Sequence, residues 1–524
     1  MGHDNSGANY DSAIATVLLV VAVVYGTFVF KGGFDNNVEM DSAGQVSDSA
    51  HSEHDEASSH DSELAGSGVP HDEGHGDGHD ASEHELPSVY AVLPFVLLLG
   101  AIAVFPLLKR VEHWWESNLH RFYVAAGLAI VTLGYYLLAR GGWHSVEHVL
   151  EHAILKEFIP FIVLLFSLYA ISGGIRIRGD LPATPVINCI FLAIGGALAS
   201  FIGTTGAAML LIRPLIDTNN ERKHCQHTIV FFIFVVCNCG GCLLPIGDPP
   251  LFLGYLEGVP FLWTMWSLWL PWLFTNVLLI AIYFVVDKFY YYPKETLLDI
   301  RRDNTETRPL KISGLLPNAI LLLGVILAVA LLDPTKPING WAPWPYLREI
   351  VQLSLVAASL LLGSAKVRAD NKFNYHAILE VAALFIGIFI CMQPALEILN
   401  VKGASLGVDT PTKYFWVTGS LSSVLDNAPT YLVFYKTCDA GFSEPLHSLV
   451  QTPGVATQNL VSISLGAVFM GAMTYIGNGP NFMVRAIAEQ MGIRMPGFFG
   501  YVVRYSVPCL LPVFVLVTLV FLRT

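Results

Sequence analysis

The chain has 524 residues, of which 53% are hydrophobic and only 14% are charged. Soluble domains carry about 25% charged residues, so this composition excludes a set of soluble domains and indicates a membrane protein. A formal net charge of −13 without a basic stripe excludes nucleic-acid binding. The acidity is local, because residues 31–86 hold fifteen Asp and Glu residues against Lys31 alone.

The first 87 residues divide into two parts. Residues 12–30 are an uncharged apolar run, so residues 1–30 are predicted to form a membrane anchor helix. A cleaved signal peptide is the alternative, although a basic start and a clear cleavage site are missing. Residues 31–87 are rich in Ser, Asp, Glu, Gly and His and predict a disordered external linker. His71, His75 and His79 are candidate metal ligands there, and a solvated acidic linker explains them as well.

From residue 88 onward, apolar segments alternate with short polar loops. The predicted segments are 88–107, 122–139, 158–175, 186–217, 228–258, 260–287, 313–332, 346–363, 376–397, 414–435, 459–490 and 497–522. They predict an all-α polytopic membrane protein with about 11 transmembrane helices and two re-entrant helical hairpins.

The two hairpins follow from the placement of Lys and Arg, which mark cytosolic loops. Segment 186–217 lies between Arg178 and Arg222, so both of its ends are expected to be cytosolic. Segment 414–435 offers only 22 residues, whereas two crossings need about 40. It is therefore expected to enter from outside and turn back at residues 425–429. On this topology, residues 31–87 and the C-terminus are external.

The two halves of the transporter part repeat each other. Residues 246–252 (IGDPPLF) recur as 476–482 (IGNGPNF), and the hairpin tip 204–206 lines up with 426–428. This defines repeat 1 at 88–290, a cytosolic linker at 291–312 and repeat 2 at 313–524. Because the hairpins enter from opposite sides, the repeat is inverted. Inverted repeats with interrupted helices indicate a secondary transporter whose site lies near mid-membrane, while Pro and Gly kinks in ordinary packed helices are the alternative.

Three motifs resemble those of a known superfamily. Residues 423–429 (SVLDNAP) are similar to the Ser-x-x-Asp-Asn-x-Pro hairpin of NhaD-type sodium/proton antiporters. Residues 238–241 (NCGG), followed by 245–248 (PIGD), and residues 203–208 (GTTGAA) resemble two more of their stretches. Over about 88–522 the chain thus resembles the ion transporter superfamily, which also includes dicarboxylate, citrate and arsenite carriers. The resemblance implies a scaffold domain, a moving transport domain, an elevator mechanism and a homodimer.

Two carboxylates at the helix break and at the hairpin tip are the principal candidates for a site. Burial favours the protonated form of such a group, while a bound cation favours the ionised form. Neutral oxygens nearby suit a hard cation. The candidate ion or substrate ligands are Asp248, Asp426, Asn427, Thr204, Thr205, Asn238, Gly247, Asn478, Asn481 and Ser423, with Asp248 and Asp426 as Na⁺ ligands.

The favoured function is exchange of Na⁺ or Li⁺ for H⁺ across a bacterial inner membrane, with no enzymatic activity and no cofactor beyond these ions. Transport of citrate or another carboxylate is the alternative. Two carboxylates would repel a free citrate, so it would travel as a metal complex or after Na⁺ has neutralised the site. An arsenite carrier and an intramembrane aspartyl protease that uses both aspartates are further alternatives.

Overall fold

The computed structural model describes residues 86–108, 110–296, 308–337 and 341–523. The predicted anchor at 1–30 and nearly all of the His-rich linker, including His71, His75 and His79, lie outside these residues. Seven of the described helices are long and apolar enough to cross a membrane, or up to eight if one bent pair counts as a single span. The prediction of a helical membrane protein is thereby confirmed, and the count of 11 spans stays a prediction.

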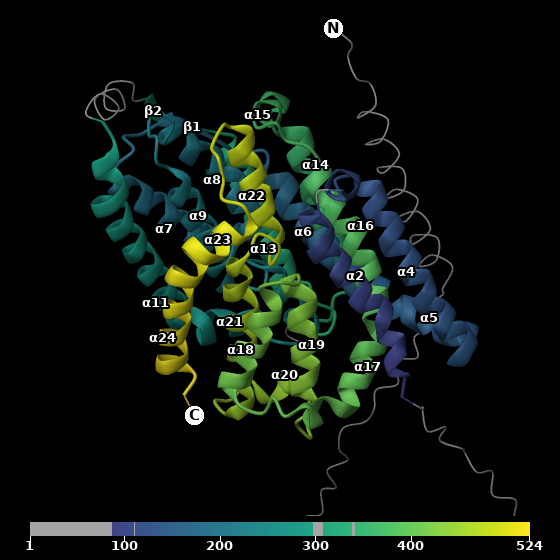
Figure 1. The fold of residues 1–524 in the computed structure, drawn as a ribbon. Coiled ribbons are helices and arrows are strands. Elements are labelled where there is room, and N and C mark those ends of the chain that lie inside the picture. Colours follow the sequence, from purple (N-terminus) through teal and green to yellow (C-terminus); the bar gives the residue numbers. More distant parts are fainter. Residues whose placement is uncertain (1–85, 109, 297–307, 338–340, 524) are drawn as a thin grey trace, which may run out of the picture. The chain divides into compact units, whose positions relative to one another are not determined.

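The helices follow the predicted order, with several spans divided into shorter pieces (Figure 1). The longer ones are α2 (Leu93–Val104), α4 (Asn118–Ala139), α5 (Trp143–Leu150), α6 (Ile159–Ser172), α7 (Pro185–Ile202), α8 (Thr204–Thr218), α9 (Gln226–Val235), α10 (Pro249–Leu256), α11 (Trp263–Val286), α13 (Leu315–Leu331), α14 (Leu347–Leu362), α16 (His376–Cys391), α17 (Gln393–Lys402), α18 (Pro411–Ser422), α19 (Asn427–Asp439), α21 (Val455–Met470), α22 (Gly479–Gln490) and α24 (Leu511–Phe521). Shorter helices are α3 (Glu112–Trp115), α15 (Ala365–Asp370), α20 (Leu446–Leu449) and α23 (Phe498–Tyr501).

Each predicted hairpin is a pair of packed helices. In segment 186–217, α7 and α8 meet at Gly203, whose φ of 79° lies in the left-handed region that glycine tolerates best. In segment 414–435, α18 and α19 meet between Ser422 and Asn427. Helix α7 alone is long and apolar enough to span a membrane, so re-entry of the two pairs stays a prediction.

The two predicted helix breaks have nearly the same backbone conformation. Asp248 has φ −142° and ψ 143°, Asn478 has φ −153° and ψ 137°, and each is the N-cap of a helix with proline in its first turn. At Gly247 and Gly477, an added Cβ would lie 2.1 and 2.6 Å from the carbonyl oxygen of an upstream glycine. The same close approach of two backbones therefore demands glycine in both copies.

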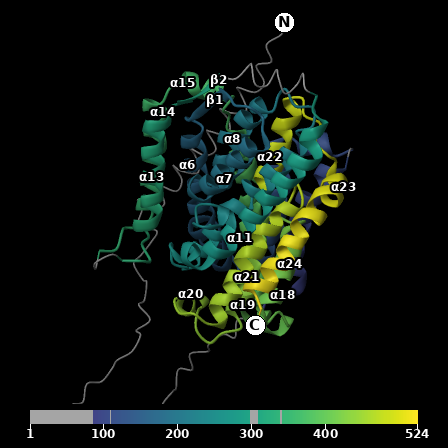
Figure 2. The same ribbon diagram turned by 90° about the vertical axis from the view of Figure 1, so that its left-hand side faces the viewer.

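Two sets of helices pack within the described part of the chain. In one set, α4 packs on α16, and α13 and α14 pack on each other and on α6. In the other, α7 packs on α8, α18 on α21, α10 on α19 and α22 on α8. Figure 2 shows α13 and α14 at one edge of the view, apart from α18, α21 and α24. The helices that begin at the candidate site residues, α8, α10, α19 and α22, all belong to the second set, and Asn238 follows α9.

The described part of the chain is almost entirely helical, as predicted, and it also contains one short antiparallel ribbon. Strands β1 (Arg176–Asp180) and β2 (Arg308–Ser313) pair with Ile177 opposite Ile312 and Arg178 opposite Lys311. Both segments were predicted as cytosolic loops, but Ile177 stands between two arginines and Lys311 between Leu310 and Ile312, a local alternation that suits a strand with one apolar face. In Figure 1 the ribbon and α15 lie at one end of the described part, while α17, α20 and the end of α24 lie at the other.

Candidate functional site

Four helices begin around one buried carboxylate. Asp248 is 1% exposed, and its Oδ1 accepts hydrogen bonds from the Thr204 hydroxyl at 2.9 Å and the Asn478 amide at 3.0 Å. Its Oδ2 accepts a hydrogen bond from the Asn427 amide at 2.7 Å. The structure therefore brings the first tip, the second tip and both helix breaks to one place, as the repeat predicts.

The position of these side chains follows from where their helices start. Thr204 is the first residue of α8 and Asn427 the first of α19, while Asp248 and Asn478 cap α10 and α22. The Thr204 backbone N–H donates to the Gly247 carbonyl at 2.8 Å, which fixes the first tip against the first break. Four helix N-termini thus converge on Asp248, and their partial positive charge stabilises an anion there.

The preceding helices end in the same region. Ser200 near the end of α7 donates to the Gly240 carbonyl at 2.6 Å, and Ser422 at the end of α18 donates to the Ala467 carbonyl at 2.6 Å. The C-terminal ends of helices carry partial negative charge and free carbonyl oxygens. Helix ends of both signs therefore gather around the two breaks, an arrangement that suits an anion and a cation together.

A network of amides joins the two repeats behind Asp248. The Asn238 amide donates to Asn481 Oδ1 at 2.7 Å, and the Asn478 amide also reaches the Cys237 carbonyl at 2.9 Å. The Asn481 amide donates to the carbonyls of Gly471 and Thr474 at 2.9 and 3.0 Å. These three carbonyl oxygens were not predicted as part of the site, because nothing in a side-chain pattern identifies a backbone acceptor.

Asp426 lies beside this network without joining it. Its Oδ1 caps α19 by accepting a hydrogen bond from the Ala428 N–H at 3.1 Å. Within the described ranges, neither carboxylate forms an ion pair with a basic side chain. The site thus combines two acidic groups with neutral donors and acceptors.

Two of the predicted ligands lie outside the Asp248 network. Thr205 is half-buried and follows Thr204 at the first tip. Ser423 donates its hydroxyl to the Ser420 carbonyl at 2.7 Å, and its own carbonyl accepts from Thr474 Oγ1 at 2.6 Å. Both residues belong to the tips by position, and Ser423 links its own turn to the second helix break through Thr474.

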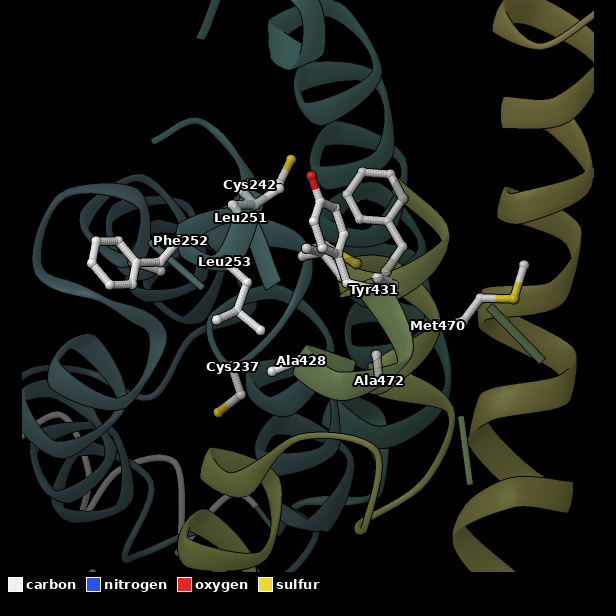
Figure 3. Packing of buried hydrophobic residues seen from close by; sticks show 14 of the residues in the cluster. Cys237, Cys242, Leu251, Phe252, Leu253, Ala428, Tyr431, Met470 and Ala472 are labelled. Atoms are coloured by element: carbon white, nitrogen blue, oxygen red, sulfur yellow. The ribbon is translucent and has the colours of Figure 1, made fainter. Parts of the chain in front are cut away.

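Apolar side chains surround the polar centre. Figure 3 shows Leu251 and Leu253 of α10 on the side of Ala428 and Tyr431 of α19, while Phe252 points the other way; all five residues are at most 2% exposed. The dense apolar packing excludes water from this side of the site. Because electrostatic interactions are stronger in such surroundings than in water, one added or removed charge at Asp248 has a large effect.

Comparison with known proteins gives one family. A family model described as "Putative citrate transport" matches residues 83–522, which is most of the chain. A search of curated proteins finds no match.

Proposed function

From the premise that the chain belongs to this citrate-transport family, we propose that it is a secondary active transporter that moves citrate or a similar carboxylate together with a cation. The observation that carries the proposal is the convergence of helix ends of both signs on a buried carboxylate without a basic partner. Asp248 serves as the cation or proton site, and the helix N-termini face the carboxylates of the substrate.

The donor set at Asp248 supports a cation or a proton as the coupling ion. Rotation of the Asn427 and Asn478 amides would present their oxygens in place of their N–H groups, and Thr204 offers a hydroxyl oxygen. Carboxylate, amide and hydroxyl oxygens are ligands that hard cations prefer. Protonation of Asp248 would instead keep the present hydrogen bonds nearly unchanged.

The substrate has to arrive with compensating charge. Asp248 and Asp426 would both repel a free tricarboxylate, and no basic side chain among the described residues pairs with either of them. Citrate is therefore expected to bind as a metal complex or after Na⁺ has occupied Asp248. The partial positive charge at the starts of α8, α10, α19 and α22 supports the anionic part of such a complex.

An elevator mechanism fits the division of the helices into two packed sets. The set around α4, α13, α14 and α16 would form the scaffold, and the set that holds the site would move as the transport domain. We expect a homodimer in a bacterial inner membrane, with the ribbon end of the chain cytosolic because it carries the Lys- and Arg-rich loops.

Exchange of Na⁺ or Li⁺ for H⁺ is the second candidate. It is favoured by the motif resemblance and by the fact that, among the described residues, neutral hydroxyl and amide side chains surround Asp248. An aspartyl protease dyad shares a proton between adjacent carboxylates, whereas no hydrogen bond joins Asp248 to Asp426 in the described structure.

Transport by the purified protein in proteoliposomes separates the two functions. Labelled citrate would be offered with a Na⁺ gradient, with a pH gradient and with or without Mg²⁺, beside a cation-pulse assay of proton release. Citrate uptake that needs one of these cations is the expected result. Proton release driven by Na⁺ or Li⁺ without citrate uptake would replace the proposal with the exchanger.

A further inference from the structure

A polar cavity lies at the far ends of the helices that hold the site. Its volume is about 470 Å³, within the range of roughly 300–1,000 Å³ typical of small-molecule sites. The end of α8, the start of α9, the segment after α11 and the turn after α22 surround it. The described lining residues are Ile216, Asn219, Asn220, Arg222, Lys223, His224, Cys225, Gln226, His227, Tyr291, Met491, Gly492, Ile493 and Arg494.

The charged side chains that line this cavity are all basic. Arg222, Lys223 and Arg494 line it together with two histidines, and none of the described lining residues is acidic. Arg494 has no ion-pair partner among the described residues, while its backbone carbonyl accepts a hydrogen bond from Gln226. Arg222 pairs with Asp287 and His224 lies 3.4 Å from Glu295, so Arg494 is the cation in the lining that is available to a ligand.

Two acidic residues behind the wall hold the basic residues in place. Asp287 accepts hydrogen bonds from both terminal nitrogens of Arg222, at 3.0 and 2.5 Å. Glu295 accepts the backbone N–H groups of Lys223 and His224 at 3.1 and 2.9 Å. These contacts fix the loop between α8 and α9, so the basic groups face the cavity on a rigid support rather than on a free loop.

His227 adds an unsatisfied buried nitrogen to the same wall. The residue is fully buried, its ring stacks on Tyr291 with centroids 3.9 Å apart, and its Nε2 lies 3.0 Å from Asp287 Oδ1. A carboxylate only accepts hydrogen bonds, so Nε2 carries the proton and donates. Nδ1 has no hydrogen-bond partner, although buried polar atoms are normally paired.

We propose that this cavity binds a small soluble polyanion that carries carboxylate or phosphate oxygens. Arg494, Lys223 and His224 surround the anion, and His227 donates from Nδ1 after it takes up a proton. The groups that face His227 and set this protonation are Asp287, Arg222, Glu295, Tyr283 and Tyr291. Anion binding is thus coupled to the uptake of a proton and strengthens as the pH falls.

The position of the cavity connects such binding to the transport site. Helix α8 runs from Thr204 to the cavity, α9 runs from the cavity toward Asn238, and α22 runs from Asn478 to the turn that carries Arg494. A bound anion would hold the far ends of these three helices together. An effect on turnover rests on the proposed function, whereas the binding itself does not.

Calorimetric titration of the full-length protein in detergent tests the proposal, with inorganic phosphate as the first probe and citrate as the second. Repeating each titration in buffers of different ionisation enthalpy counts the protons taken up. We expect Arg494→Gln to weaken phosphate binding about tenfold and His227→Asn to abolish the proton uptake. Arg485→Gln is the matched control, because Arg485 lies on α22, pairs with Glu489 at 3.0 Å and does not line the cavity.

The variant Asp248→Asn separates this proposal from the proposed function, because it is expected to lose transport and to keep phosphate binding. Equal phosphate affinity in wild type and Arg494→Gln would overturn the proposal, and so would the absence of binding by both anions. Binding only to nanodiscs that contain phosphatidylglycerol would also overturn it, in favour of a lipid headgroup. Arg494→Gln keeps the test decisive even where His227→Asn does not fold.

Discussion

Replacing Asp248 by Asn tests the core of the proposed mechanism, because it removes the charge and keeps the shape. The side chain now accepts three hydrogen bonds from Thr204, Asn427 and Asn478. An amide at this position retains one acceptor oxygen and places an N–H group against at least one former donor. Each hydrogen bond to a charged group contributes about 1.5–3 kcal/mol to stability, so the lost bonds destabilise the variant. This loss is partly offset, because the variant no longer buries a charge. The variant is therefore expected to fold.

The effect on a bound cation is larger. Two unit charges about 4 Å apart attract each other by about 4 kcal/mol at an effective dielectric constant of about 20, which corresponds to roughly a thousandfold in Kd. Binding of radioactive sodium to the purified protein, and uptake driven by Na⁺ and by pH gradients, would measure the loss. Asp409→Asn is the control, since Asp409 is exposed and pairs with Lys413 at 2.7 Å. Cation affinity and coupled uptake within about threefold of wild type in Asp248→Asn would refute the assignment.

Three further outcomes are expected. Asp426→Asn should fold normally, since Asn caps a helix as well as Asp does, and should weaken cation binding less than Asp248→Asn in the same assay. Gly247→Ala should abolish the monodisperse yield in size-exclusion chromatography, because its Cβ would lie 2.1 Å from a carbonyl oxygen; Gly479→Ala has no atom within 4 Å of the new Cβ and should be tolerated. Deletion of residues 31–86 should leave transport in proteoliposomes unchanged, and a correctly inserted deletion variant without transport would contradict that expectation.

The helix breaks were predictable because their causes are local. Proline lacks a backbone donor and glycine permits close backbone approach. Residues 246–252 and 476–482 therefore predict a break in a helix without any knowledge of their surroundings. The repeat also predicted that the two helix breaks lie close to Thr204 and Asn427 at the hairpin tips. Segments that recur at nearly constant spacing in the two repeats are expected to occupy equivalent places in the fold. The sequence could not show which side chains at the tips reach Asp248. Thr205 and Ser423 were predicted as ligands for this reason, and the structure places both outside the Asp248 network.

Features that depend on distant partners were missed. The alternating pattern at Ile177 suits a strand, but its partner Ile312 lies more than a hundred residues away, so a short ribbon was indistinguishable from two loops. The predicted span 376–397 is divided into α16 and α17, which are bent by 46°, with Pro394 in the first turn of α17 as the available signal. Arg222 was interpreted as a marker of a cytosolic loop, and its burial was not predicted: it is only 7% exposed, because Asp287 from a distant segment binds it.

For the proposed alternating-access transport, the hydrogen bonds of Asp248 limit which parts of the molecule can separate. Of its three donors, Thr204 comes from its own repeat, whereas Asn427 and Asn478 come from the other. A rocking motion that separates the two repeats would break the hydrogen bonds of the buried Asp248 carboxylate to Asn427 and Asn478. Each of these bonds contributes about 1.5–3 kcal/mol to stability. The proposed elevator mechanism is therefore expected to move both helix breaks as one unit, with its sliding surface between this unit and the neighbouring helices rather than between the two repeats.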